Sequence, residues 1–209
     1  MTKKELLKDI DFYFITDSRL TKKSVLDDVK AAIAGGVKLI QYREKEKSKQ
    51  EMIEEASKIK ELCGDDVILI INDDVDVALA VNADGVHLGS DDVPYDVARE
   101  KLGKDKIIGI TTRNAEDGVK AENLGADYVS IGPIFSTTTK PDLKPVGIEM
   151  IEKVKNAINI PFVAIGGINF DNLDSVIEAG AAKVAAISAV VAKDDVEKEV
   201  RKFIGRIRK

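Results

Sequence analysis

The sequence predicts an α/β fold, a TIM (β/α)8 barrel formed by a single domain. Short apolar runs alternate with longer segments of helical period along the 209 residues, and this alternation is typical of parallel strands joined by crossover helices. An open doubly wound sheet usually carries a glycine-rich turn after its first strand, whereas this chain has Thr16-Asp17-Ser18-Arg19 at that point. The closed barrel is therefore the favoured arrangement.

Eight apolar runs are the expected strands, because each is short and rich in β-branched or aromatic residues. In chain order they are Phe12 to Thr16, Lys38 to Arg43, Val67 to Asn72, Gly85 to Leu88, Ile107 to Thr111, Tyr128 to Gly132, Phe162 to Ile165 and Val184 to Ser188.

Eight segments with an apolar stripe at helical spacing are the expected helices. They are Ser24 to Ala34, Lys49 to Leu62, Val75 to Val81, Tyr95 to Leu102, Ala115 to Leu124, Ile148 to Ile158, Leu173 to Ala179 and Val196 to Ile207. Gly35, Gly103, Gly125 and Gly180 follow the last periodic residue of four helices, where a left-handed C-cap is commonly needed.

The composition suits one globular domain over residues 1–209, with 44% hydrophobic and 33% charged residues and a net charge of -5. The acidic balance argues against nucleic acid as a partner. The single cysteine, Cys63, excludes a disulfide framework within one chain, so a reducing cytoplasm is the expected location. No apolar run is long enough to span a membrane. Small molecules are the expected partners, and a homo-oligomer is left open.

In a barrel, functional side chains collect where the strands end. After the second strand, Gln41, Arg43 and Lys45 alternate along the chain, so they are expected to share the barrel mouth. A solvated charge run is the alternative interpretation of these residues.

Acidic residues end the third and fourth strands, in Asn72-Asp73-Asp74 and in Gly89-Ser90-Asp91-Asp92. Neighbouring strands lie about 5 Å apart, and carboxylates crowded in this way repel unless a cation joins them. A hard divalent cation with oxygen ligands, Mg²⁺, is the natural candidate. Helix N-capping by Asp74 and Asp91 is the alternative.

Two further strand ends favour phosphate binding. The sixth strand runs into a hydroxyl-rich loop from Gly132 to Pro141, which suits an oxyanion or is merely a mobile loop. Gly166-Gly167 and Ser188 close the last two strands, where TIM barrels often bind a phosphate through backbone N–H groups. His87, the only histidine, is expected to be a hydrogen-bonded supporting residue, and without a Ser/His/Asp set covalent acyl chemistry has no support.

Taken together, these residues resemble the thiamine phosphate synthase family, and the resemblance covers nearly the whole chain. The segments that carry it are Tyr13-Phe14-Ile15-Thr16-Asp17, Gln41-Tyr42-Arg43-Glu44-Lys45, Asn72-Asp73-Asp74, Gly85-Val86-His87-Leu88-Gly89, Gly132-Pro133-Ile134-Phe135, Thr137-Thr138-Thr139-Lys140 and Ile165-Gly166-Gly167-Ile168, in family order.

The resemblance implies a Mg²⁺-dependent transferase that joins 4-amino-5-hydroxymethyl-2-methylpyrimidine diphosphate to 4-methyl-5-(2-phosphoethyl)thiazole, or its carboxylated form, and releases diphosphate. It places Mg²⁺ on Asp73 and Asp92. It implies that the pyrimidine diphosphate is bound by Gln41, Tyr42, Arg43, Glu44, Lys45, Asn72 and Thr111, and the thiazole phosphate by Thr137, Thr138, Thr139, Gly167, Ile187 and Ser188. Lys140 would help to hold the diphosphate.

An electron-rich aminopyrimidine can expel diphosphate and leave a stabilised cation, which the thiazole nitrogen then captures. Catalysis by Arg43, Lys45 and Lys140 would be mainly electrostatic, and Thr111 occupies the place of a family serine near the diphosphate. Replacement of Lys140 by alanine is expected to lower turnover strongly without unfolding the barrel.

Two alternatives remain at this point. One is a thiazole tautomerase on the same barrel, which would need a histidine just after the fifth strand, where this chain has Thr111-Thr112-Arg113-Asn114. The other is a non-catalytic barrel that binds a phosphorylated metabolite through Gly166-Gly167.

Overall fold

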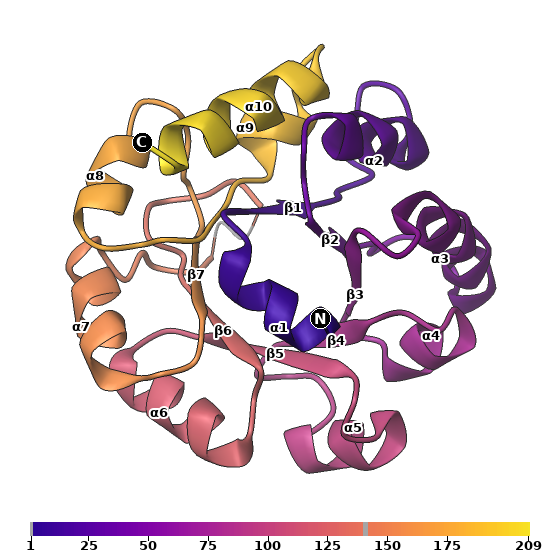
Figure 1. Ribbon diagram of the computed structural model, residues 1–209, viewed down its shortest axis with the longest axis horizontal. Helices are drawn as coiled ribbons and strands as arrows, with labels where there is room; N and C mark the ends of the chain where they lie inside the picture. Colours follow the sequence, from indigo (N-terminus) through magenta and orange to yellow (C-terminus); the bar gives the residue numbers. More distant parts are fainter. Residues whose placement is uncertain (1, 140–141) are drawn as a thin grey trace.

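The computed structural model, described here for residues 2–139 and 142–209, is a closed barrel of eight parallel strands surrounded by helices (Figure 1). The strands are β1 Phe12–Ile15, β2 Leu39–Tyr42, β3 Ile68–Asn72, β4 Gly85–Leu88, β5 Ile107–Thr112, β6 Tyr128–Ile131, β7 Phe162–Ile165 and β8 Val184–Ala185. They pair in sequence order, and β8 closes the barrel on β1 through the pairs Phe12–Val184 and Tyr13–Ala185. The predicted fold class is confirmed.

The eight helices expected from the sequence are all present and form the outer ring (Figure 1). They are α2 Val25–Ala34, α3 Lys49–Cys63, α4 Val75–Ala80, α5 Tyr95–Leu102, α6 Ala115–Leu124, α7 Glu149–Ala157, α8 Leu173–Glu178 and α10 Val196–Ile207. A short helix, α9 Ser188–Val191, lies between β8 and α10. Within the described part of the chain, no helix combines the length and apolar character needed to cross a membrane.

The N-terminal segment covers one end of the barrel, as the indigo helix across the centre of Figure 1 shows. It consists of α1 Lys3–Leu6 and the 3₁₀ helix η1 Leu7–Asp9. A capping box stabilises its start, because Thr2 and Glu5 satisfy each other's backbone N–H groups. Leu7 and Ile10 are buried against the residues that fill the barrel interior. The opposite end, where the strands finish, is thereby left as the open one.

Strand alternation divides the core into two parts. Tyr13 and Ile15 of β1 belong to the cluster inside the barrel, whereas Phe12 and Phe14 belong to the larger cluster between strands and helices. The aromatic ring of Phe12 stacks on Phe203 of α10 with ring centroids 5.1 Å apart. Side chains on the inward register of each strand are therefore the ones available to a site within the barrel.

Two details of the sequence prediction are wrong. The last strand ends at Ala185, and Ser188 begins α9, because the apolar run from Val184 is equally compatible with a strand and a short helix. Gly35 has a right-handed conformation with φ −68°, so it is not a left-handed cap. A Cβ at Gly35 would lie 2.7 Å from a methyl carbon of Val200, so the glycine allows the close approach of α10 to α2.

Cys63 ends α3 and is buried, and burial raises the pKa of its thiol to about 11. Near neutral pH the thiolate population is therefore about a hundredfold smaller than for an exposed cysteine. We expect a thiol reagent to label the native protein far more slowly than the protein unfolded in guanidinium, as followed by chromophore release. Equally rapid labelling of both forms would contradict this description of Cys63.

Candidate active site

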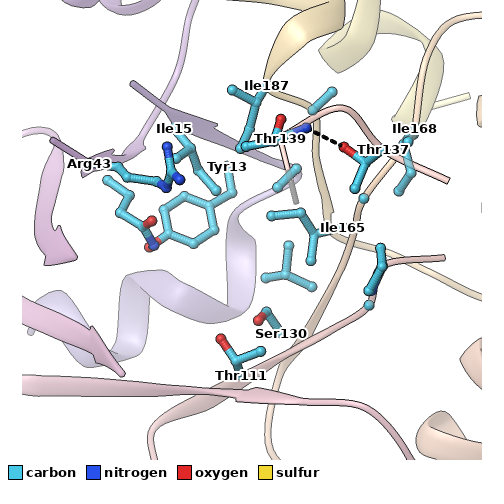
Figure 2. Close-up of a pocket in the computed structure, with 18 of the residues that line it drawn as sticks. Tyr13, Ile15, Arg43, Thr111, Ser130, Thr137, Thr139, Ile165, Ile168 and Ile187 are labelled. Carbon is cyan, nitrogen blue, oxygen red and sulfur yellow. Dashed lines mark hydrogen bonds between the residues drawn. The ribbon is translucent and has the colours of Figure 1, made fainter. Parts of the chain in front are cut away.

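A cavity of about 110 Å³ opens among the carboxyl ends of the strands (Figure 2). Apolar side chains, including Ile15, Val163 and Ile165, form part of its lining. The sequence-predicted residues that line it are Gln41, Arg43, Asn72, Thr111, Thr137, Thr139, Gly167, Ile187 and Ser188. In Figure 2, Arg43 lies beside Tyr13, and Thr137 lies near Ile168 across the cavity. The barrel thus brings together residues that are up to 147 positions apart, from Gln41 to Ser188.

Arg43 is fixed on one side of this cavity by a buried ion pair. Its Nη1 donates to the Asp17 carboxylate over 2.6 Å, and its backbone N–H donates to the Thr16 hydroxyl over 2.9 Å. Burial alone would raise the pKa of Asp17, but hydrogen bonds from Arg19 and the charge of Arg43 outweigh it and lower that pKa. The carboxylate stays ionised, so the guanidinium is held in one orientation with donors available to an anion.

Lys45, Asp73 and Asp92 form a charged group beside the cavity, next to Asn72 on its wall. Lys45 donates to Asp73 over 2.5 Å, and Asp92 accepts from the backbone N–H of Gly89 over 2.6 Å. Burial raises the pKa of Asp92, and the neighbouring Asp73 carboxyl raises it further. For Asp73, burial acts in the same direction, but hydrogen bonding with Asp92 and Lys45 outweighs it and lowers the pKa.

The carboxyl groups of Asp73 and Asp92 interact directly, which the cation site expected from the sequence requires. Asp73 follows the last residue of β3 and has φ 64°, a left-handed conformation that is uncommon for a residue other than glycine. The chain turns at this residue before α4 begins. Within residues 2–139 and 142–209, no group of three or more His, Cys, Asp or Glu side chains could hold a metal alone. The two carboxyl groups of Asp73 and Asp92 fit Mg²⁺, which commonly uses one or two carboxylates together with water and substrate phosphates.

Only one of the two N-capping alternatives is observed. Asp74 caps α4 by accepting from the backbone N–H of Val77 over 2.9 Å. Asp91 is exposed, and the residue at the N-cap of α5 is Pro94, which makes no side-chain cap hydrogen bond. Capping thus accounts for Asp74 but leaves Asp73 and Asp92 for another role.

Tyr42 and Glu44 are not among the cavity-lining residues, although the family resemblance includes them among the substrate contacts. Tyr42 is fully buried, and its hydroxyl donates to Glu55 of α3 over 2.7 Å. Glu44 is also buried and accepts through Oε1 from Ser18 and from the backbone N–H of Lys45. These two residues therefore anchor the segment between β2 and α3, and their role at the substrate stays a prediction.

The hydroxyl-rich loop and the double glycine meet on the other side of the cavity. Gly166 and Gly167 have φ 99° and 67°, and a Cβ on Gly167 would lie 2.4 Å from the carbonyl oxygen of Ser136. Thr138 lines an adjoining hollow together with Gly167 and Ser188. Lys140 lies outside the described residues.

A set of polar residues at the base of the cavity was not included among the predicted site residues. Tyr13, His87 and Ser130 line the cavity, and Tyr128 hydrogen-bonds to His87. His87 also contacts Thr111, so its expected supporting role agrees with the geometry. The inward register of the strands was the available signal for Tyr13 and Ser130.

Comparison with known proteins decides the family. The family model described as thiamine monophosphate synthase matches residues 12–190. The chain is 56% identical over 207 residues to thiamine-phosphate synthase of Methanosarcina mazei, across 99% of this chain and 86% of that protein. It is 54% identical over 208 residues to the Methanosarcina barkeri protein of the same name, across 99% of this chain and 94% of that protein. The chain belongs to the thiamine monophosphate synthase family.

A solved structure agrees with this membership. The thiamine phosphate pyrophosphorylase from Pyrococcus furiosus superposes with a TM-score of 0.89 and 38% identity, across 97% of this chain and 98% of that one. Membership of the thiamine monophosphate synthase family makes the chain an enzyme, a transferase of thiamine biosynthesis. The resemblance found in the sequence is confirmed.

Proposed function

We propose that this enzyme condenses 4-amino-5-hydroxymethyl-2-methylpyrimidine diphosphate with 4-methyl-5-(2-phosphoethyl)thiazole, or its carboxylated form, to give thiamine phosphate and diphosphate. One observation carries the proposal. A single cavity is lined by Arg43 and Asn72, by Thr137, Gly167 and Ser188, and by apolar side chains such as Ile165. Such a cavity can hold two anionic groups at its edges and bring two rings together between them.

The reaction breaks the bond between the ring methylene of the pyrimidine and the diphosphate oxygen. The electron pair leaves with the diphosphate, and the lone pair of the thiazole nitrogen forms the new carbon–nitrogen bond. Arg43 and Lys45 stabilise negative charge as it grows on the leaving group, and Thr111 donates a hydrogen bond there. Asp17 keeps the Arg43 guanidinium oriented, so little reorganisation is needed during the reaction.

The second substrate is positioned by its phosphate. Thr137, Gly167 and Ser188 offer hydroxyl and backbone donors at one edge of the cavity, and Thr138 offers another in the adjoining hollow. The ring would then lie over Ile165 and Ile187, where apolar contacts exclude water from the cation. Lys140 contacts the diphosphate in this proposal, as the sequence motif suggests.

Asp73 and Asp92 would hold the metal. A bound Mg²⁺ supplies Lewis-acid neutralisation of the diphosphate charge and fixes its orientation. Lys45 already pairs with Asp73 and offers a second positive charge at the same edge. The free Cys63 and the absence of other cysteines agree with a reducing cytoplasm, which we propose as the location.

The proposal is tested by incubating the purified protein with both phosphorylated substrates and Mg²⁺ and measuring thiamine phosphate by its thiochrome fluorescence. We expect product that requires both substrates. A tautomerase would instead isomerise the carboxylated thiazole without the pyrimidine, and a non-catalytic sensor would bind the thiazole phosphate without forming product. Either outcome would overturn the proposed function.

A further inference from the structure

A continuous chain of hydrogen bonds crosses the barrel just below the cavity. The Gln41 amide contacts the Tyr13 hydroxyl over 2.8 Å, and the Tyr13 and Tyr128 hydroxyls are 2.8 Å apart. Tyr128 is 2.9 Å from His87 Nδ1, and His87 Nε2 is 2.9 Å from the Thr111 hydroxyl. The two ends, Gln41 and Thr111, both line the cavity.

The barrel makes specific room for this chain. A Cβ on Gly109 would lie 2.1 Å from the Tyr128 ring and 2.5 Å from the Tyr128 hydroxyl oxygen. A side chain at position 109 is therefore incompatible with the hydrogen-bond chain. Burial raises the pKa of both Tyr13 and Tyr128, so both phenols keep their protons. Tyr13, Tyr128 and Gln41 are each at most 3% exposed, which excludes bulk water from most of the links.

Each link needs one proton, and only two arrangements make every link while both phenol protons stay within the chain. In the first, Gln41 donates to Tyr13, Tyr13 to Tyr128 and Tyr128 to His87 Nδ1, so His87 carries its proton on Nε2 and donates to Thr111. In the second, every link is reversed. A mixture of the two would leave two oxygens facing each other with either no proton or two between them, which costs a buried hydrogen bond.

The two arrangements present different groups to the cavity. In the first, the Gln41 carbonyl oxygen is free to accept, and the Thr111 hydroxyl proton is free to donate. In the second, Gln41 presents its amide hydrogens to the cavity. His87 Nε2 then accepts a hydrogen bond from the Thr111 hydroxyl or from the Ser130 hydroxyl, which is 3.2 Å away. The Gln41 acceptor is therefore presented to the cavity in the same arrangement as the Thr111 donor.

We propose that Tyr13, Tyr128 and His87 are positioning residues that couple recognition of a ring amino group at Gln41 to donation by Thr111 toward the leaving diphosphate. The inference rests on the proposed function for the identity of the ring. An amino group donates to the Gln41 carbonyl and selects the first arrangement, which turns the Thr111 proton outward. A 4-oxo ring accepts from the Gln41 amide and selects the second arrangement, in which Thr111 no longer donates toward the diphosphate.

The arrangement can be observed directly, because His87 is the only histidine in the chain. In untagged protein labelled with ¹⁵N-histidine, long-range proton–nitrogen NMR reports which ring nitrogen is protonated. With the pyrimidine diphosphate bound and no thiazole present, we expect the tautomer protonated on Nε2, with Nδ1 bare. Protonation on Nδ1 in that complex would overturn the proposal, whether or not the enzyme makes thiamine phosphate.

Kinetics give the second test, using variants that remove one tyrosine hydroxyl each. Tyr128→Phe cuts the hydrogen-bond chain, whereas the control Tyr95→Phe removes a hydroxyl of α5 that donates to the Gly125 carbonyl outside the barrel. The wild-type protein should show a higher kcat with the 4-amino than with the 4-oxo pyrimidine diphosphate. In Tyr128→Phe we expect the kcat part of this preference to fall about tenfold, as one hydrogen bond corresponds to roughly that factor.

The Tyr95→Phe variant should keep the wild-type preference. The intrinsic difference in reactivity between the two rings cancels, because the same pair of substrates is compared in each variant. An unchanged kcat preference in folded Tyr128→Phe would show that the two ends act independently and would overturn the coupling. If the wild-type protein formed no product, the proposed function would be wrong. The NMR result would still test the hydrogen-bond chain.

Discussion

Replacing Asp73 or Asp92 by asparagine is expected to lower the rate of thiamine phosphate formation by about a hundredfold or more. The two carboxyl groups interact directly at the edge of the cavity, and we propose that they share the metal that binds the diphosphate. Asparagine keeps the size of the side chain, and it tolerates the left-handed backbone of Asp73. The loss should therefore come from the missing charge and not from unfolding.

The matched control is Asp91→Asn, because Asp91 is the exposed neighbour of Asp92. Its turnover should stay close to that of the wild-type protein. Since Asp92 has the raised pKa, it takes up a proton first as the pH falls, and Mg²⁺ affinity should weaken through that titration. Equal activity of the Asp73, Asp91 and Asp92 variants would remove the basis for a shared metal.

Arg43→Gln is expected to lower turnover by about a hundredfold, through loss of a charged donor at the leaving group. Arg43 is buried, lines the cavity and pairs with Asp17. The substitution also leaves Asp17 with less compensation for its burial, so a lower melting temperature is expected as well. Turnover under saturating substrates and a thermal melt measure the two effects separately.

Arg19→Gln is the control for the structural part of this effect. Arg19 binds the same Asp17 carboxylate, but its side chain is 44% exposed and it is not among the cavity-lining residues. It should reduce stability modestly and leave turnover within a few-fold of the wild-type value. If the Arg19 and Arg43 variants lost activity equally, Arg43 would be acting through the fold alone.

The strand ends could be predicted from the sequence because parallel strands of a barrel finish on the same side. Local alternation correctly placed Gln41 and Arg43 on the cavity, and the same rule directs Tyr42 and Glu44 away from it, whereas Lys45 lies beside the cavity and pairs with Asp73. The position of Asp73 next to Asp92 followed from strand order, which a regular barrel fixes. These features depend on short-range periodicity and on topology, both of which are present in the residue pattern.

The hydrogen-bond chain below the cavity could not be predicted in the same way. Tyr13 and Tyr128 are 115 positions apart, and their contact depends on the strand register of the closed barrel and on the space left by Gly109. The end of β8 differs from the prediction because a short apolar run does not distinguish a strand from one helical turn. The N-terminal helix did carry a local signal, the capping box of Thr2 and Glu5.

The most direct test of the account is the metal dependence of product formation by the wild-type protein. Thiamine phosphate formation from the two phosphorylated substrates should stop in a chelator and return in proportion to added Mg²⁺, and the Asp92→Asn variant should need a higher Mg²⁺ concentration for half-maximal rate. Full-speed coupling of the two rings in the presence of chelator would contradict the account.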